Sequence, residues 1–416
     1  MQKNKFMRKS ALLTAGFLMP AVMAFSAGYQ INVQGVRQIG MGGTGVATPW
    51  DASTIFYNPG GLSRLNSLQA YGSLSLLIVN TRYNQSPVQG YSEDAKTGVY
   101  SPFNLYVGGP LRSGSKLGVG LGIYTPFGSG LTWNDSWEGQ FIIQSIKLQS
   151  FFIQPTVSYA ISDEISLGAG FVYALGNVNL KRGIPVQNMA GMNGQAELSG
   201  NANGIGFNAG LHIQASDQIR IGITYRSRVN MEVESGEARF DVPTSVAGNF
   251  PSTSFATTLP LPSVASIGIA YKPNEDLTIQ ADINYTSWKA YDALSFDYEL
   301  NTPTLQDTRA PRNYSNKATF RLGGHYQVNS SFAVMAGGAY DPSPVANGYV
   351  SPDLPDANHW IASAGATYKI TPRLNLMGAL EYNTTVKRDA QYIPDNFNGQ
   401  YQTKAVVPSI GVTYDF

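Results

Sequence analysis

Residues 277–286 read Leu-Thr-Ile-Gln-Ala-Asp-Ile-Asn-Tyr-Thr, a stretch in which apolar and polar side chains alternate. A period of two is typical of a β-strand whose two faces meet different surroundings. The same alternation runs through 205–214 and through 406–416, where the given chain ends. We therefore expect a fold made mainly of strands with one apolar and one polar face.

Segments of strand character recur along the whole chain, with connections that alternate between short and long. The fourteen segments are 68–83, 102–112, 116–125, 140–161, 165–181, 204–215, 218–233, 264–273, 277–291, 317–328, 332–341, 359–370, 374–386 and 403–416. Short turns at one rim and long polar loops at the other are typical of an outer-membrane barrel. The sequence thus predicts an all-β, transmembrane antiparallel β-barrel of about 14 strands over 66–416. The alternative, a soluble sandwich or propeller, would not alternate its connections in this way.

The N-terminal residues do not fit the strand pattern. Residues 1–24 combine a basic start with a short apolar run ending at Ala24, which is typical of a cleaved secretory signal peptide. That run is shorter than the roughly 20 residues that span a bilayer as a helix. Residues 25–65 are rich in Gly and turn-forming residues. Because a barrel of this width is not filled by its own side chains, we expect 25–65 to fold inside as a plug, or hatch.

The composition excludes several classes of protein. Only 13% of the residues are charged, whereas soluble domains contain about a quarter. The net charge of +1 indicates no nucleic-acid partner. The chain has no cysteine, which excludes disulfides, thiolate metal sites and cysteine nucleophiles.

One motif matches a cofactor site in spacing but lacks its context. Residues 40–45 fit the dinucleotide pattern GxGxxG, which requires a surrounding βαβ unit that this sequence does not predict. His212, His325 and His359 lie far apart in the sequence. We expect no cofactor, no metal and no catalysis, although a barrel hydrolase that uses His325 stays open as an alternative.

Several stretches resemble one family of barrel proteins. Residues 27–65 contain Asn58-Pro59-Gly60 and are similar to the hatch of the FadL-type long-chain fatty acid transporters, which ends in Asn-Pro-Ala. Residues 340–365 and the stretch Tyr285-Thr286-Ser287-Trp288 also resemble segments of this family, and the chain ends in Phe416, as barrel proteins often do. Gly60 in place of Ala departs from the family pattern. The resemblance covers 27–416 and implies a fourteen-stranded barrel with an N-terminal hatch, in agreement with the strand count.

The resemblance also implies a function: passive uptake of long-chain fatty acids or similar hydrophobic molecules across the outer membrane of a Gram-negative bacterium. The loops expected at 182–203 and 234–263 carry apolar residues where polar ones are usual. The family captures its ligand between these loops, which points to Met189, Met192, Phe240, Phe250, Phe255 and Leu259. For the ligand headgroup, the resemblance implies Lys317, Lys181 or Arg182, and a hydroxyl from Thr125. Alternatively, the loops simply pack together and cap the barrel.

The third expected strand, 116–125, has features of a lateral opening. Three of its glycines share one face, and Pro126, which cannot donate a ladder hydrogen bond, follows directly. The family has a kink in this strand, so the resemblance implies that ligand leaves sideways into the bilayer there. The residues concerned are Gly118, Gly120, Gly122, Pro126, Phe127 and Gly128. It also implies that movement of the plug, at Asn58, Pro59 and Gly60, acts as the gate.

Outer-membrane lipid and the barrel assembly machinery are the further partners that we expect. A closed barrel has no free sheet edge and needs no second copy, so we expect a monomer. Two other functions stay open. Uptake of aromatic hydrocarbons would need no cation for a headgroup, and a surface adhesin or receptor would have a fully plugged lumen and bind no lipid.

Overall fold

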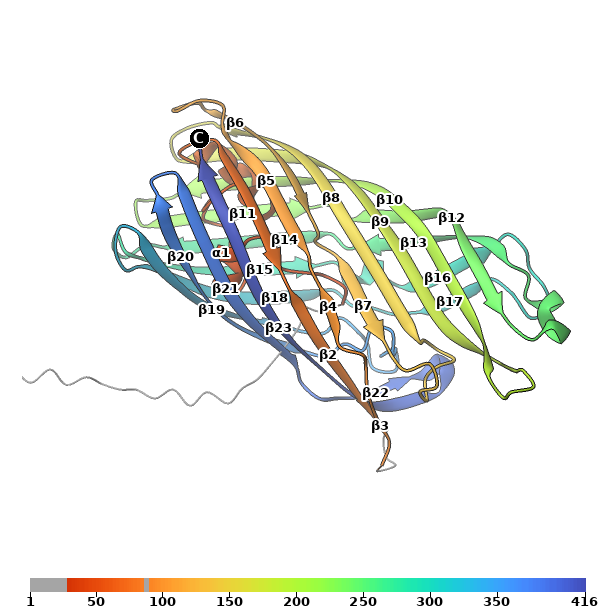
Figure 1. Cartoon of the computed structure of the whole chain (residues 1–416). Helices are drawn as coiled ribbons and strands as arrows, with labels where there is room; N and C mark the ends of the chain where they lie inside the picture. The colour runs from red at the N-terminus through yellow and green to blue at the C-terminus, as the bar shows by residue number, and fades with distance from the viewer. Residues whose placement is uncertain (1–27, 86–89) are drawn as a thin grey trace, which may run out of the picture.

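The computed structural model describes residues 28–85 and 90–416, and the signal peptide expected at 1–24 lies outside them. An antiparallel sheet of fourteen wall strands closes on itself into a barrel (Figure 1). Closure comes from β1 (Gln69–Ser75) and β23 (Phe397–Asp415), which pair from Gln69 opposite Asp415 to Ser75 opposite Ser409. The transmembrane-type β-barrel expected from the sequence is confirmed.

The wall is built from strands in chain order, some of them interrupted and some continued beyond the wall as outer hairpins. The strands of the first half are β1, β2 (Leu77–Asn84), β3 (Ser92–Asp94), β4 (Gly98–Tyr100), β5 (Phe103–Pro110), β6 (Leu117–Tyr124), β7 (Gly128–Thr132), β8 (Ser145–Ala160), β9 (Ile165–Gln187), β10 (Asn193–Gln214), β11 (Ile219–Arg226) and β12 (Val229–Asp241). Those of the second half are β13 (Thr253–Leu261), β14 (Val264–Tyr271), β15 (Leu277–Thr286), β16 (Ala293–Tyr298), β17 (Thr308–Pro311), β18 (Lys317–Gln327), β19 (Phe332–Asp341), β20 (His359–Thr371), β21 (Leu374–Thr385), β22 (Arg388–Tyr392) and β23.

Helices are few and short. They are α1 (Val36–Gly40), α2 (Thr54–Tyr57), and the 3-10 helices η1 (Pro59–Arg64), η2 (Thr244–Asn249), η3 (Trp288–Ala290) and η4 (Ile393–Asp395). None of the helices in the described residues is long and apolar enough to cross a membrane.

Each of the fourteen expected segments coincides with a wall strand, but most of the expected long loops contain strands, and the errors are largest at 182–203 and 234–263. In the first, β9 continues to Gln187 and β10 begins at Asn193, so only a tight turn at 188–192 separates them. In the second, β12 and β13 extend far into 234–263. Beyond the bilayer, neither face of a hairpin contacts lipid, so the apolar–polar alternation fades although backbone pairing continues. The alternation in the sequence therefore ends before the strands of these hairpins do, and the sequence predicted loops where the strands continue.

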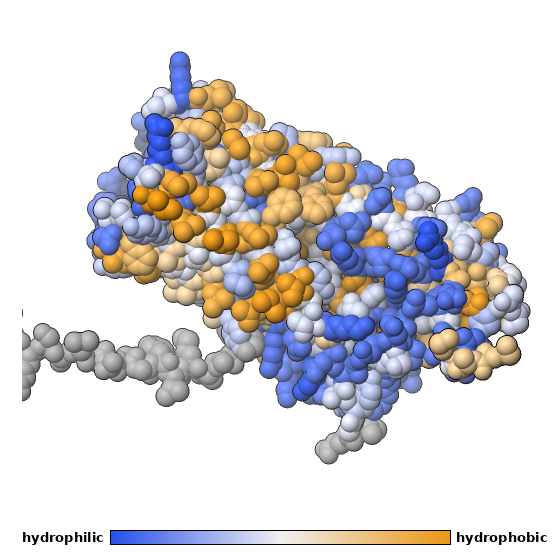
Figure 2. All heavy atoms as spheres, viewed as in Figure 1, coloured by the Kyte–Doolittle hydropathy of each residue, from blue (hydrophilic) through white to orange (hydrophobic). Residues whose placement is uncertain are grey.

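The two faces of the wall are inverted relative to a soluble protein. On β15, Ile279, Ile283 and Tyr285 are exposed on the outside, while Thr278, Gln280 and Asp282 are buried inside. Hydrophobic side chains gather over the end of the barrel that carries the C terminus, and hydrophilic ones over the opposite end with the long hairpins (Figure 2). An apolar outer band and a polar interior suit a barrel set in a bilayer.

Residues 28–65 lie inside the barrel, where α1 is seen between the walls (Figure 1). The segment touches strands on several sides of the lumen. The Gly42 amide donates to Ser363 on β20, and the Gly45 amide donates to Asp282 on β15, at 2.7 Å. Arg321 on β18 donates to the Gly42 carbonyl. Because nearly all of 33–65 is buried, the segment fills much of this part of the lumen. The boundaries expected at Ala24 and Leu65 stay predictions.

Candidate functional site

The wall is interrupted in its third strand, between β6 and β7. β6 pairs with β5 on one side and with β8 on the other, whereas in the described residues β7 pairs only with β8. The register with β8 shifts by one residue between Tyr124, opposite Phe152, and Gly128, opposite Gln149. An extra residue of this kind is a bulge, and Pro126 within it has no N–H to donate. On the far side, β4 pairs with β2 and not with β7, so the wall has a gap between β4 and β7.

The N-terminal segment patches the interruption. Gln30 forms an isolated antiparallel bridge with Phe127. The Ile31 amide donates to the Pro126 carbonyl at 2.8 Å, and the Gly128 amide donates to the Tyr29 carbonyl at 2.9 Å. Backbone groups that the broken strand would leave unpaired thereby find partners, as buried backbone requires. The chain from 29 to 31 acts as a short substitute strand.

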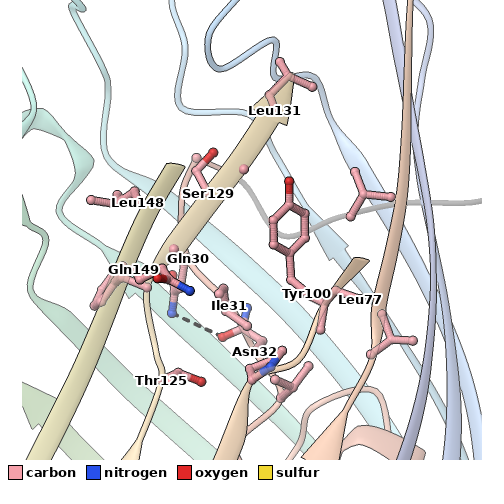
Figure 3. A pocket seen from close by; sticks show the side chains of 18 of the residues that line it. Gln30, Ile31, Asn32, Leu77, Tyr100, Thr125, Ser129, Leu131, Leu148 and Gln149 are labelled. Atoms are coloured by element: carbon pink, nitrogen blue, oxygen red, sulfur yellow. Dashed lines mark hydrogen bonds between the residues drawn. The ribbon is translucent and has the colours of Figure 1, made fainter. Parts of the chain in front are cut away.

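A cavity of about 550 Å³ lies at this gap. Figure 3 shows Gln30, Ile31 and Asn32 between Leu148 and Gln149 of β8 on one side and Tyr100 and Leu77 on the other. Further lining comes from β2, β7, β20, β21 and β23 and from the connection between β19 and β20, which contributes 353–356. The lining includes the titratable side chains of Lys147, His359 and Glu381. Val99 on β4 lines the cavity and is 62% exposed, so the cavity reaches the outer surface of the barrel.

Tyr100 covers the gap from the β4 side. A Cβ built on Gly130 of β7 would lie 2.2 Å from the Tyr100 ring, so the ring rests directly against the backbone of β7. Above this contact the Lys96 amide donates to the Thr132 carbonyl at 2.8 Å. The gap is therefore bounded at one end by the N-terminal segment and at the other by Lys96 and Thr132, with Tyr100 between them.

A second, smaller cavity of about 50 Å³ adjoins the first on the side toward the long hairpins. It is lined by apolar residues of the outer hairpins, including Met231, Leu259 and Phe296, and none of the described residues that line it is charged. The two cavities share six lining residues: Phe127, Ser129, Leu148, Gln149, Ser150 and Leu354. They adjoin each other across these side chains.

Inside the barrel, Asn58 fixes the turn that leads into η1. Its side-chain amide donates to the Val46 carbonyl at 2.8 Å and to the Leu211 carbonyl of β10 at 3.0 Å. Its side-chain oxygen accepts from the Gly60 amide. A Cβ on Gly60 would lie 2.8 Å from the Gly210 carbonyl oxygen, so the close approach to β10 explains why Gly stands here.

Arg226, at the end of β11, links the N-terminal segment to the strand-three break. Its guanidinium lies 3.8 Å from the centre of the Phe56 ring and donates to the Phe56 carbonyl at 2.7 Å. The Phe56 ring in turn meets the Tyr124 ring edge-on, with centres 5.2 Å apart. Tyr124 is the last residue of β6 before the bulge. Direct contacts therefore link Arg226 and Phe56 to Tyr124, the residue at which strand three breaks.

A family model described as Outer membrane protein transport protein (OMPP1/FadL/TodX) matches residues 17–416 of this chain. The chain belongs to this family. The long-chain fatty acid transport protein of Escherichia coli (strain K12) is 24% identical over 410 residues, which cover 88% of this chain and 90% of that protein. Outer membrane protein P1 of Haemophilus influenzae (strain ATCC 51907 / DSM 11121 / KW20 / Rd) is also 24% identical, with 88% of each chain covered.

Solved structures of the FadL/TodX family share the fold. A Pseudomonas aeruginosa FadL homologue superposes with a TM-score of 0.78 at 20% identity, covering 95% of this chain and 100% of that one. The P. putida toluene transporter TodX superposes with a TM-score of 0.73 at 17% identity, covering 92% and 98%. The protein is therefore an outer-membrane barrel of a family that transports hydrophobic compounds.

Of the headgroup residues expected from the FadL-type resemblance, only Thr125 lines either of the two described cavities. It is 7% exposed and sits at the start of the bulge. Lys181 forms an ion pair with Glu197 at 3.0 Å on the outer part of the β9–β10 hairpin. Lys181, Arg182 and Lys317 line neither cavity. The structure thus does not bring the basic candidates together with Thr125, and their role stays a prediction.

The expected capture residues fall into three places. Met189 and Met192 lie in the turn between β9 and β10 and are exposed. Phe240, Phe250 and Phe255 belong to an apolar cluster between the outer hairpins. Of these residues, Leu259 alone lines one of the two described cavities, the smaller one.

The strand-three glycines provide close packing and not free space. A Cβ on Gly118 would lie 2.9 Å from the Ser63 backbone, and one on Gly120 would lie 2.7 Å from the Ile55 side chain. One on Gly122 would lie 2.9 Å from the Tyr106 ring. The cavity begins beyond them, at Thr125, Phe127 and Gly128. Tyr100, Arg226 and Leu354 were missed by the sequence reasoning, because no local pattern marks contacts made across the barrel.

Proposed function

We propose that this FadL/TodX-family transporter takes up long-chain fatty acids or similar hydrophobic molecules by passive transport and releases them laterally into the bilayer at the strand-three break. The observation that carries the proposal is the larger cavity, which lies inside the barrel at the gap between β4 and β7 and also reaches exposed Val99. A molecule in this cavity has the lumen on one side and the lipid-facing surface on the other.

Lateral release avoids the main energetic obstacle to moving a long alkyl chain. Exposing one methylene to water costs about 0.8 kcal/mol, so a tail of many methylenes does not leave readily into the aqueous periplasm. A sideways exit lets the tail pass from the apolar part of the wall of the larger cavity, which includes Leu77, Val99 and Phe103, to the hydrocarbon of the bilayer. The sequence predicts no nucleotide-binding site. We therefore propose that the concentration gradient of the ligand drives its lateral release.

In this proposal the N-terminal segment is the plug and the gate. The bridge between Gln30 and Phe127 lies at the edge of the gap, and Ile31 lines the cavity. Ligand that leaves between β4 and β7 must displace this short stretch or the Tyr100 ring. Asn58, Pro59 and Gly60 hold the deeper part of the segment against β9 and β10, so they set how far it moves.

Capture takes place at the outer hairpins. The exposed Met189 and Met192 offer apolar surface above the barrel, and Leu259 leads into the smaller cavity. Once the ligand tail is inside, a carboxylate requires cationic or hydrogen-bonding partners, since burying it without them is costly. We assign this role to Thr125 at the larger cavity, with Arg182, Lys181 and Lys317 acting earlier along the route.

Uptake of aromatic hydrocarbons is the second candidate, and one observation favours it. The smaller cavity has no charged lining in the described residues, and Tyr29, Phe127, Tyr291 and Phe296 contribute aromatic rings to it. Such a site suits a ligand without a charged group. The P. putida relative in the structural comparison is named a toluene transporter.

The test is uptake by cells whose outer membrane has no other route for hydrophobic compounds. Cells carrying this chain should accumulate radiolabelled palmitate faster than cells without it, and the variants Lys317→Ala and Arg182→Ala should lower palmitate uptake while sparing toluene. If toluene alone is taken up, the aromatic candidate replaces the first. If neither is taken up and detergent-purified protein binds neither, the barrel is a receptor or adhesin without transport.

Three further parts of the proposal concern partners. Phe416, at the C-terminal end of β23, is 61% exposed, so the barrel assembly machinery can reach it. We also propose that outer-membrane lipid contacts the apolar outer band of the barrel. The sheet closes without a free edge at β1 and β23, so the barrel needs no second copy. We propose a monomer without enzymatic activity, and unchanged uptake by a His325→Ala variant would agree with that.

A further inference from the structure

The connection between β19 and β20, residues 342–358, folds into the mouth of the barrel instead of projecting from it. We call these residues the inner loop. Val350 and Asp353 are buried, at 2% and 4% exposed. Its residues 353–356 line the larger cavity, and Leu354 lines the smaller cavity as well. The inner loop therefore lies where the two cavities adjoin.

A buried ion pair ties the inner loop to the segment before β18. Arg312 donates both terminal nitrogens to the carboxylate of Asp353, at 2.9 and 2.7 Å. The two side chains are only 6% and 5% exposed. A bidentate pair fixes orientation as well as distance. Asp353 is the neighbour of Leu354, so this pair holds the backbone that carries Leu354.

Two other parts of the barrel hold the inner loop as well. The Trp133 indole donates to the Pro352 carbonyl at 3.1 Å, from the connection that follows β7. Arg388, at the start of β22, donates to the Asp356 carbonyl at 3.0 Å and to the Val345 carbonyl at 2.9 Å. Because three parts of the barrel hold the backbone around Leu354, we expect the Leu354 side chain, and not the backbone, to move when a molecule passes.

Five wall residues line both cavities together with Leu354. Phe127 and Ser129 come from strand three, and Leu148, Gln149 and Ser150 come from β8. Leu354 is the only inner-loop residue among the six that both described cavities share. On the proposed route, a molecule that moves from the smaller cavity to the larger one passes beside Leu354 and these wall residues.

We propose that Leu354 is a specificity-determining residue, which sets the cross-section of the hydrophobic molecules that pass from the smaller cavity to the larger cavity. The proposal rests on the proposed uptake function and adds the residue that selects among its ligands. Because the backbone is held at Asp353, Pro352 and Asp356, a smaller side chain leaves space that the loop does not collapse to fill. A larger side chain narrows the passage for the same reason.

The experiment compares three probes of increasing width in cells that depend on this chain for hydrophobic uptake. The probes are radiolabelled palmitate, whose linear chain is narrow, toluene with one ring, and naphthalene with two. Leu354→Ala removes three carbon atoms, and a single methylene in an apolar site already changes discrimination by roughly tenfold, so this variant should raise naphthalene uptake relative to palmitate by roughly tenfold or more. Leu354→Trp should lower naphthalene and toluene uptake more than palmitate uptake.

Leu300 provides the matched control. It is 52% exposed in the connection between β16 and β17 and lines neither cavity, so Leu300→Ala and Leu300→Trp should leave all three rates unchanged. Heat-dependent gel mobility confirms that each variant is folded, and Leu354→Met, similar in volume, should behave as wild type. Unchanged ratios in folded Leu354→Ala and Leu354→Trp overturn the proposal. Failure of the wild-type chain to take up any probe refutes the proposed function instead.

Discussion

Gln30 of the N-terminal segment stands directly opposite Phe127 of the interrupted third strand, in an antiparallel bridge. The flanking hydrogen bonds run from the Ile31 amide to the Pro126 carbonyl and from the Gly128 amide to the Tyr29 carbonyl. In this arrangement the two residues form a non-hydrogen-bonded pair, for which the Cα atoms lie about 4.5 Å apart. The same contact joins the N-terminal segment to the wall at the edge of the larger cavity, so under the proposed mechanism the gap opens when this contact is released.

The bridge can be locked, because the chain contains no cysteine. A Gln30→Cys/Phe127→Cys pair falls within the Cα separation of about 4.4–6.8 Å that a disulfide accepts. We expect the oxidised double variant to lose most of its palmitate uptake, and a reductant to restore it. The single variants Gln30→Cys and Phe127→Cys are the controls, and neither should respond to reductant. Full uptake by the oxidised protein contradicts gating by this segment.

Removing the Tyr100 ring should widen the lateral gap. The ring rests against Gly130 and covers the space between β4 and β7. Tyr100→Ala is expected to increase entry of a hydrophobic fluorescent probe into the bilayer several-fold, while Tyr100→Trp keeps the gap covered and stays near the wild-type rate. Tyr159→Ala, which removes an exposed ring elsewhere on the barrel, is the control. If Tyr100→Ala behaves like Tyr159→Ala, ligand does not leave at this gap.

The Arg312–Asp353 pair should make the inner loop sensitive to acid. Burial alone would raise the pKa of Asp353, but the charge and hydrogen bonds of Arg312 outweigh it and hold the pKa of that carboxyl below its usual range. The pair therefore stabilises the loop above the unfolded-state pKa of about 3.9, and this stabilisation is lost as pH falls through the folded-state pKa. Hydrogen exchange of 342–358 should accelerate as the pH is lowered from about 5 to 2, relative to intrinsic rates.

Two variants separate this pair from general effects of acid. Asp353→Asn removes the carboxylate, so exchange in 342–358 should be fast at every pH and nearly flat below about pH 5. Asp292→Asn removes the partner of Arg309 in an ion pair whose side chains are 64% and 67% exposed, and it should change nothing measurable. A wild-type loop whose exchange does not depend on pH in this range contradicts the stabilising role of Asp353.

Gly60→Ala should loosen the plug. The new Cβ would lie 2.8 Å from the Gly210 carbonyl oxygen, a contact that requires the backbone of η1 or β10 to shift. Overpacking of this kind costs about 1–3 kcal/mol. We expect faster hydrogen exchange in 45–65 and greater entry of large antibiotics into cells. Gly248→Ala, where a Cβ would meet nothing within 4 Å, is the control. Wild-type exchange in Gly60→Ala shows that the family's Ala would be tolerated here.

The wall strands could be predicted from the sequence because lipid and lumen impose opposite polarity on successive residues. Ile279 and Ile283 face lipid while Gln280 and Asp282 face the lumen, and this inversion produces the period-two pattern directly. The pattern failed where the environment no longer differs between the faces. Lys181 and Glu197 face each other in the β9–β10 hairpin beyond the bilayer, and the sequence there indicated a loop.

The candidate site was predictable only where it lies in one stretch of chain. Pro126 marks the break in strand three, and Thr125, Phe127 and Gly128 beside it do line the larger cavity. The basic residues proposed for the headgroup, Lys317 and Arg182, line neither cavity. These two residues lie on strands away from the break in strand three. The charge of a residue in the sequence does not show how far the folded sheet places it from the break.

By itself, the sequence determined that this chain forms a closed barrel of about fourteen strands with a polar interior, and where its third strand breaks. Only the tertiary structure decided that Gln30 pairs with Phe127, that Tyr100 rests against Gly130 and that Leu354 lines both cavities. The physical reason is that strand patterning reports the local solvent of each side chain. Contacts across a lumen depend instead on how the closed sheet brings distant residues together.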